Sequence, residues 1–484
     1  MVFSSIIFLF CFLPVTLGIY FLLGRRGQNA WLLLASLVFY AWGEVFYVAV
    51  MLASIAANYA VGVLIAAFRG GRWARLILGI GIAADLAILV FFKYSAFLAE
   101  NLSFLMSPIL GRTAAGIDPG HLPLGISFFT FQSMSYIIDV YRGAAPAQRN
   151  PLNIGLYIAL FPQLIAGPIV RYHDLARQIV SRRVRLPDFA AGAERFVFGL
   201  GKKVLIANNA GAIADPIFAV SSGDLTAPVA WLGIVCYTIQ IYFDFSGYSD
   251  MAIGLGRMFG FRFLENFNYP YIARSMRGFW RRWHISLSTW FRDYLYIPLG
   301  GSRKGPLRTY ANLATVFFLV GLWHGASWNF VVWGLFHGTF LVLERLGLGS
   351  LLERCWRPIR HGYVLAVVMT GWVFFRAETL SGALGYLEAM MGLTAGDALR
   401  YPLETYLDRQ AWGVVLCGAV FATPVFPAVR AWMRRLGESA GGVAGVMSRC
   451  AAGAMENAAF VLLLAGSILF LAAGSYNPFI YFRF

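Results

Sequence analysis

Apolar runs of membrane-spanning length recur along this chain, and they constrain its fold more than any other feature. A helix that crosses a bilayer needs about 20 mostly apolar residues. Runs near that length cover residues 5–23, 30–47, 49–68, 76–98, 122–141, 227–247, 361–376, 411–428 and 456–474. Of the 484 residues, 59% are hydrophobic and 13% are charged, whereas a soluble chain carries about a quarter charged residues. The sequence therefore predicts an all-α polytopic membrane bundle, with residues 1–484 forming a single integral membrane domain.

Three further runs depart from this pattern. Residues 152–170 contain Pro162 and Pro168, which disfavour an unbroken helix. Residues 190–207 carry four charged side chains, and residues 310–345 are long enough for two helices but too short for two full crossings. Broken backbone at membrane depth is tolerated where protein or a cavity satisfies it. We therefore expect about 10–12 crossings, with re-entrant segments around a central cavity that the first of these runs helps to line.

Basic residues between the runs set the expected orientation. Every second loop is basic, beginning with Arg25 after the first run and Arg69 after the third. Because basic loops stay in the cytoplasm, both termini are expected outside and residues 257–308 inside. Residues 310–345 then form a hairpin or re-entrant pair with residues 321–325 near its tip. This topology, together with contact with anionic membrane lipid, accounts for the net charge of +16, so no nucleic-acid partner is expected.

His324 is the strongest candidate for chemistry. It lies 14 residues into the apolar run that starts at Tyr310, which corresponds to roughly 20 Å of helix in a bilayer about 30 Å thick. A titratable group at that depth is a candidate for function, and a neutral imidazole can accept a proton from an attacking hydroxyl. Gly321 and Gly325 permit a sharp bend beside it. The structural alternative is a histidine that is hydrogen-bonded within the bundle or caps a break.

His284 is the second candidate, in a region rich in arginine and tryptophan. If residues 280–294 are helical, one face carries Trp280, His284, Ser288 and Phe291. That mixed face suits a cavity wall, and Arg281 and Arg282 beside it could contact the phosphates of an acyl donor. The alternative is an interfacial helix with snorkelling arginines and anchoring tryptophans. It leaves the histidine and the serine unexplained.

The remaining polar candidates are weaker. Asp244, Ser246 and Tyr248 end an apolar run but follow no nucleophile-elbow pattern, so we expect them to line a pocket and not to form a Ser–His–Asp triad. Gln163 and Arg171 bracket the broken run, which is either a packed kink or part of a donor tunnel. The five cysteines have no CxxC spacing. Neither a metal site nor a disulfide framework is therefore predicted.

Several of these stretches resemble the membrane-bound O-acyltransferase (MBOAT) superfamily, in particular its bacterial branch of alginate O-acetyltransferase membrane subunits. The strings that carry the resemblance are WRRWHISLSTWFRDYLYIPLGG from Trp280, GLWHGASWNFVVWG from Gly321, FPQLIAGPIVRY from Phe161, QIYFDFSGYSDMAIG from Gln240 and FIYFRF from Phe479. The resemblance implies that His324 is the central catalytic residue and general base. It also implies that His284 orients or polarises the thioester, and it adds Trp323, beside His324, to the substrate-binding candidates.

The resemblance further implies an activity and its partners. The donor would be acetyl-CoA from the cytoplasm, with no bound cofactor, and the enzyme would lie in the bacterial inner membrane with both termini in the periplasm. A periplasmic acetyltransferase of the SGNH or alginate-modifying type would receive the acetyl group and O-acetylate a secreted, alginate-like polysaccharide.

Two questions stay open at this point. FIYFRF resembles a tail motif in which the tyrosine, here Tyr481, is proposed to carry the acyl group, whereas composition alone suggests an aromatic membrane anchor. The acceptor could also be peptidoglycan or cellulose, or the reaction could be D-alanyl transfer to teichoic acid. An alternative from a different functional class is that the chain is a transporter or assembly scaffold of polysaccharide export without chemistry of its own.

Overall fold

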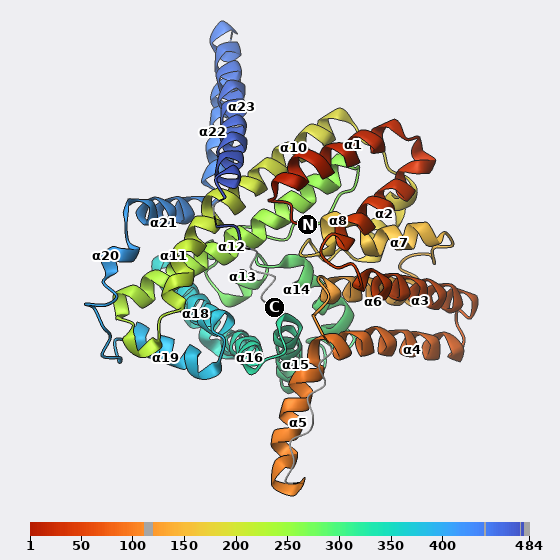
Figure 1. Cartoon of the computed structure of the whole chain (residues 1–484), viewed down its shortest axis with the longest axis horizontal. Coiled ribbons are helices and arrows are strands. Elements are labelled where there is room, and N and C mark those ends of the chain that lie inside the picture. The colour runs from red at the N-terminus through yellow and green to blue at the C-terminus, as the bar shows by residue number, and fades with distance from the viewer. Residues whose placement is uncertain (111–119, 440–441, 475, 479–484) are drawn as a thin grey trace.

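Helices form all of the regular structure in the part of the chain that the structure describes, residues 1–110, 120–439, 442–474 and 476–478 (Figure 1). The structure is a computed structural model. The N-terminal third contains η1 (Phe8–Phe12), α1 (Leu13–Leu22), α2 (Arg25–Ala41), α3 (Tyr47–Ala67), α4 (Arg72–Leu89), η2 (Val90–Tyr94), α5 (Ser95–Leu110) and α6 (Ile126–Arg142). The middle contains α7 (Pro151–Ala159), α8 (Phe161–Leu164), α9 (Tyr172–Val180), α10 (Leu186–Gly201), η3 (Lys202–Ala207), α11 (Asn208–Phe218), η4 (Ser222–Asp224) and α12 (Ala227–Met258).

The second half begins with short helices and ends with longer ones. They are η5 (Pro270–Ile272), α13 (Met276–Trp280), α14 (Ile285–Phe291), η6 (Arg292–Tyr296), α15 (Pro306–His324), α16 (Trp328–Leu343), η7 (Glu344–Leu348), α17 (Gly349–Arg354), α18 (Arg357–Arg376), α19 (Leu380–Met390), α20 (Leu403–Tyr406), α21 (Arg409–Phe421), α22 (Val425–Ser439) and α23 (Gly442–Ala472). Among the η elements, η4 and η5 are 3₁₀-helical and the others are π-helical. The prediction of an all-α bundle is confirmed.

α12 is the central helix, and α10 lies along it (Figure 1). Most α12 residues are buried, whereas few of residues 453–472 in α23 are buried. Glycines let α10 and α12 approach closely, since a Cβ added at Gly254 would lie 2.5 Å from the Gly192 carbonyl oxygen. Small residues serve this purpose at helix contacts in membranes. α22 and α23 project side by side from one end of the molecule in Figure 1, and α5 projects from the other.

Fewer helices meet the requirements of a membrane span than the sequence predicts. In the described ranges, five helices are long and apolar enough to cross a membrane, or six if the bent pair formed by α21 and α22 counts as one span. Our expectation of about 10–12 crossings is higher, because it counts apolar runs of near-spanning length in the sequence. Several of those runs form shorter helices, such as α2 and α6 with 17 residues each.

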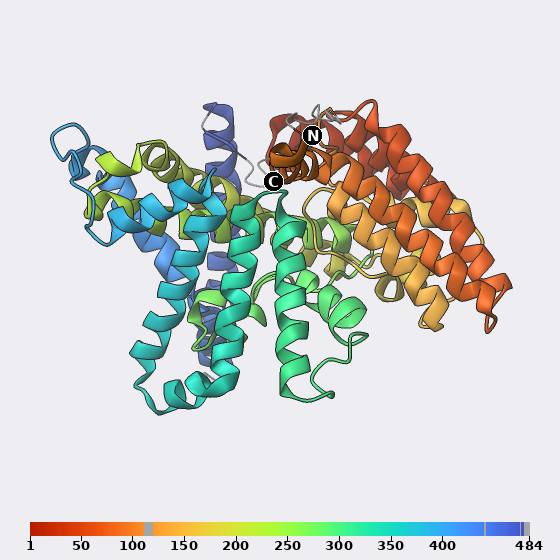
Figure 2. The same ribbon diagram turned by 90° about the horizontal axis from the view of Figure 1, so that it is seen from below.

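Two of the three irregular runs that sequence analysis singled out, 152–170 and 310–345, are broken, as predicted. Residues 152–170 form α7, a kink at Leu160 and the single turn of α8. Residues 310–345 form a hairpin of α15 and α16, whose turn lies at the upper end of the two green-to-teal helices in Figure 2. The hairpin arms touch closely, since a Cβ added at Gly334 would lie 3.1 Å from the Cα of Gly321. The turn therefore sits next to the last residue of α15, His324.

Candidate functional site

His324 is the last residue of α15, and its side chain is buried at the tip of the hairpin. Three aromatic rings surround its imidazole, with centroid separations of 4.9 Å to Trp323, 5.0 Å to Trp333 and 5.1 Å to Phe375. Its Nδ1 has no hydrogen-bond partner among the described residues. A buried polar atom of this kind in a functional protein calls for an explanation such as catalysis or bound water. The bundle therefore presents His324 as an imidazole in an aromatic cage.

The backbone around His324 is held by two side chains from the N-terminal third. Lys93 donates hydrogen bonds from Nζ to the carbonyl oxygens of Trp323 at 2.7 Å and His324 at 3.2 Å. Tyr94 donates to the carbonyl oxygen of Leu322 at 2.6 Å. The last carbonyls of a helix have no partner within it, and a cation is favourable at that end. Lys93 and Tyr94 thus cap α15 and fix the position of the histidine.

His284 does not lie on a continuous helix, so the predicted helix over residues 280–294 is wrong. α13 ends at Trp280, and α14 begins at Ile285. His284 stands between them with a left-handed backbone, φ 43° and ψ 54°. A non-glycine residue rarely adopts this conformation, and it persists where surrounding structure enforces it. Because of the break, Trp280 and Ser288 belong to two different helices and do not share one helical face with His284.

Asn266 fixes the orientation of the His284 ring. Its Oδ1 accepts hydrogen bonds from Ser286 N at 3.1 Å and Ser286 Oγ at 2.9 Å, and it lies 3.2 Å from His284 Nδ1. Because an oxygen that already accepts from a backbone N–H must be an acceptor, Nδ1 carries the proton and donates to it. Burial lowers the pKa of His284 to about 3, so the ring is neutral at physiological pH. Its Nε2 is then the acceptor nitrogen.

The structure brings the two histidines together. Their ring centroids lie 6.4 Å apart, and Trp323 lies 5.9 Å from the His284 ring and next to His324. Trp280 is also buried and contacts Trp333, which in turn contacts His324. Four predicted site residues from α13, the break after it and the end of α15 therefore form one cluster.

The predicted polar neighbours of His284 lie further out. Arg281 is exposed, and Arg282 is half-buried with Nη1 donating to the Asn268 carbonyl oxygen at 2.9 Å. Ser288 is half-buried on α14. The two arginines thus follow Trp280 directly in the sequence but lie nearer the surface than the histidines.

The polar residues of α12 have separate surroundings. Asp244 forms a buried ion pair with Lys203, 2.8 Å between Oδ1 and Nζ. Tyr248 is buried, with its ring stacked on Phe3 at 4.6 Å. Ser246 lines a large cavity. Of these three residues, only Ser246 lies where a ligand could reach it in that cavity.

Gln163 and Arg171 have structural contacts. Gln163 is fully buried, and its Nε2 donates to the Tyr157 carbonyl oxygen at 2.6 Å across the kink between α7 and α8. Arg171 pairs with Asp174 at 2.9 Å and with Asp293 at 2.5 Å, which ties α9 to η6. No residue of the 152–170 run lines the large cavity. The run is a packed kink at this point of the fold. Tyr481, the remaining candidate, lies outside the described residues.

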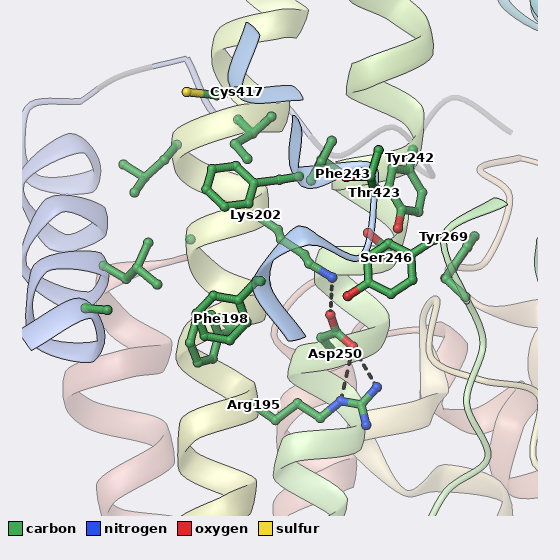
Figure 3. A pocket seen from close by; sticks show the side chains of 18 of the residues that line it. Arg195, Phe198, Lys202, Tyr242, Phe243, Ser246, Asp250, Tyr269, Cys417 and Thr423 are labelled. Atoms are coloured by element: carbon green, nitrogen blue, oxygen red, sulfur yellow. Dashed lines mark hydrogen bonds and ion pairs between the residues drawn. The ribbon is translucent and has the colours of Figure 1, made fainter. Parts of the chain in front are cut away.

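A cavity of about 1550 Å³ lies between α10, η3, α12 and α21–α23. One part is apolar, and the other contains an ion-pair network in which Asp250 accepts from Arg195 at 2.8 Å and from Lys202 at 2.6 Å (Figure 3). Arg195 also pairs with Glu265. The cavity reaches Ile285, the residue after His284, but neither histidine lines it. It is therefore adjacent to the histidine cluster and separate from it.

Sequence reasoning missed three residues of this region. Lys93 was visible as one of two charged residues, with Asp85, inside the apolar run 76–98, a signal of function or pairing in a membrane. Lys203 lay in the irregular run 190–207, and the sequence did not indicate which carboxylate it pairs with. Asn266 carries no signal of its own in the sequence, because its role depends on a contact with His284 across 18 residues.

Comparisons with known proteins agree with this geometry. Residues 142–348, which include both histidines, match the model of the membrane-bound O-acyltransferase family. The chain is 45% identical to a probable alginate O-acetylase of Pseudomonas putida and 43% identical to one of Azotobacter vinelandii, in each case over the whole of both chains. It is 34% identical to a peptidoglycan O-acetyltransferase of Helicobacter pylori, over 100% of this chain and 98% of that protein. The chain is thus a multi-pass membrane O-acyltransferase and belongs to the membrane-bound O-acyltransferase family.

Proposed function

We propose that this enzyme passes acetyl groups from cytoplasmic acetyl-CoA across the bacterial inner membrane for O-acetylation of a secreted, alginate-like polysaccharide. Full-length relatives named as probable alginate O-acetylases support the choice of acceptor. The observation that carries the chemistry is the pair of buried imidazoles, His284 and His324, with ring centroids 6.4 Å apart at the tip of the hairpin. A transporter or scaffold without chemistry of its own leaves this pair unexplained.

In the proposed reaction, His324 is the general base. It takes the proton of an attacking hydroxyl while the hydroxyl oxygen bonds to the thioester carbonyl carbon. The carbon–sulfur bond then breaks, and the coenzyme A thiolate leaves and takes up a proton. His324 stands at a helix end fixed by Lys93, which suits a base that must keep its position.

His284 has an orienting role in this proposal. A neutral ring with Nδ1–H directed at Asn266 presents an acceptor at Nε2. An acceptor can hold a hydroxyl in line for attack, whereas polarising a thioester carbonyl requires a donor. The geometry therefore favours orienting the nucleophile over polarising the thioester.

The donor would dock at the basic surface beside α13. Arg277 and Arg281 are exposed there, next to buried Trp280. By contrast, three of the four cations of the large cavity, Arg195, Lys202 and Arg430, are paired with carboxylates. Free arginines suit the phosphates of coenzyme A better than neutralised ones. On this proposal residues 257–308 face the cytoplasm and both termini face the periplasm.

The acetyl group would leave through Tyr481. In this step the phenolic oxygen attacks the acetyl carbon, its proton passes to His324, and coenzyme A leaves as the free thiol. The resulting aryl ester would donate acetyl to a periplasmic SGNH-type or alginate-modifying acetyltransferase. The test is Tyr481→Phe, which keeps the aromatic anchor and removes only the hydroxyl. Wild-type acetylation of the polysaccharide by this variant would exclude the relay.

Peptidoglycan is the second candidate acceptor, because a relative of 34% identity over nearly its full length is named a peptidoglycan O-acetyltransferase. Incubating membranes that contain the enzyme with labelled acetyl-CoA, and with alginate or peptidoglycan in parallel, distinguishes the two. Label in alginate supports the proposal. Label in peptidoglycan alone supports the second candidate, and no thiol release with either would favour a scaffold.

A further inference from the structure

Residues 476–478 follow α23 and are held against the bundle by polar contacts that fold stability alone does not explain. Asn477 is the centre of these contacts. Its Nδ2 donates to the Ser4 carbonyl oxygen at 2.8 Å, and its Oδ1 accepts from Asn208 Nδ2 at 3.1 Å and from Ser4 Oγ at 3.4 Å. Ser4 and Asn208 are both buried. The asparagine side chain thus uses both of its polar atoms to join this segment to the N-terminus and to α11.

Tyr476 makes a second attachment. Its hydroxyl donates to Asp215 Oδ2 near the end of α11. The other oxygen of that carboxylate accepts from Arg376 Nη2 at 2.7 Å, which fixes the carboxylate between α11 and α18. The Asp215 carboxylate therefore contacts Arg376 with one oxygen and Tyr476 with the other.

Lys203 makes a third attachment. Its ammonium donates to the Pro478 carbonyl oxygen and pairs with Asp244. Both charged side chains are almost completely buried, at 3% and 1% exposure. Burying an ion pair is costly, and apolar residues in its place often leave a protein equally stable. The pair therefore calls for a use beyond stability, and its ammonium has one in the carbonyl group of Pro478.

The three attachment points lie on one continuous helix, at positions 203, 208 and 215. In an α-helix, a step of five residues turns about 500° and would leave Lys203 and Asn208 about 140° apart. Lys203 lies in the π-helical segment η3, where hydrogen bonds run from residue i to i+5 and bring these two positions closer to one face. Asn208 and Asp215 are seven residues apart, which is about two α-helical turns. The π-helical segment thus aligns the three polar groups.

We propose that Lys203, Asn208 and Asp215 form a docking track that holds residues 476–478 and so fixes the point from which residues 479–484 extend. These three are positioning residues, not catalytic ones. The inference rests on the proposed function in one respect, because the track matters for turnover only if Tyr481 carries the acetyl group. Docking itself is independent of that role.

Two variants remove the track without leaving a lone buried charge. Asn208→Ala with Asn477→Ala deletes the amide contacts, and Lys203→Met with Asp244→Leu replaces the ion pair by apolar side chains. The matched control is Asn153→Ala, which removes a buried asparagine from another amide pair, 2.8 Å from Asn29 and away from the track. Each purified full-length protein is digested with carboxypeptidase Y, and the loss of C-terminal residues is followed by intact mass.

Because the track holds residues 476–478, we expect both track variants to lose these residues at least tenfold faster than the wild type, and the control to match the wild type. Equal digestion rates in all four proteins would overturn the docking. Acetyl transfer is measured on the same samples beside Tyr481→Phe. If Tyr481→Phe is inactive, the track variants must lose at least tenfold in turnover, and full turnover would refute positioning. If Tyr481→Phe is active, the relay and the positioning role both fail, and faster digestion would still establish docking.

Discussion

Gly334→Ala tests whether the close contact of α15 and α16 sets the position of His324. A Cβ at Gly334 would lie 3.1 Å from both the Cα and the nitrogen of Gly321, and closer still to the Phe317 carbonyl oxygen. Since carbon atoms prefer separations of about 3.5–4.0 Å, α16 must move away from α15 by roughly 0.5–1 Å. Trp333, the residue before Gly334, would move with it and leave its place 5.0 Å from the His324 ring.

A displacement of about 1 Å near a reacting group can cost roughly 100-fold in rate, so we expect Gly334→Ala to lose about 10- to 100-fold in turnover. Labelled acetyl-CoA and thiol release measure turnover, and thermal unfolding in detergent measures the fraction folded. Gly338→Ala should lose less, because its Cβ would meet the Phe317 side chain at 3.0 Å. Gly79→Ala, with nothing within 4 Å, is the control. Turnover of Gly334→Ala within twofold of the control would refute the reasoning.

Three further predictions concern single contacts. Asn266→Ala should reduce turnover roughly tenfold or more at unchanged KM for acetyl-CoA, because His284 loses the oxygen that orients its ring. Asn266→Asp keeps that oxygen and should keep more of the activity. Equal kinetics for the two variants would count against the orienting role of Asn266. Arg171→Ala should lower the melting temperature by roughly 2–4 °C, because the ion pairs of Arg171 join α9 to η6. Turnover per folded molecule should stay unchanged. A raised KM for acetyl-CoA would instead indicate a binding role for Arg171. A cysteine introduced at Ser302 should resist an impermeant thiol reagent in intact cells, because residues 257–308 are expected in the cytoplasm, and its modification would reverse the topology.

The hairpin and its histidine could be predicted because their signals are local. The length of the 310–345 run, its glycines and a titratable residue at depth all lie within one stretch. The kink in 152–170 follows equally from its prolines. Such features depend on backbone sterics and on the cost of burying a polar group, which act through sequence neighbours.

The surroundings of the histidines could not be predicted because they depend on long-range contacts. The ring orientation of His284 depends on Asn266, and the cap of α15 comes from Lys93, 230 residues before the Trp323 carbonyl. The partner of Lys203 lies on another helix, in Asp244. Hydropathy also does not show where an apolar run bends or shortens within the bundle, which is why five or six of the described helices have the length and apolarity of a full span.

His324→Ala is the most direct test of the central claim that His324 is the base for acyl transfer. The purified variant is compared with wild type and with His121→Ala, which removes an exposed histidine that pairs with Glu44, in the release of thiol from labelled acetyl-CoA. Loss of a positioned base costs about 10²–10⁴-fold in rate, so we expect His324→Ala to fall by at least 100-fold while His121→Ala stays near wild type and both remain folded. More than a tenth of wild-type activity in His324→Ala would contradict the claim.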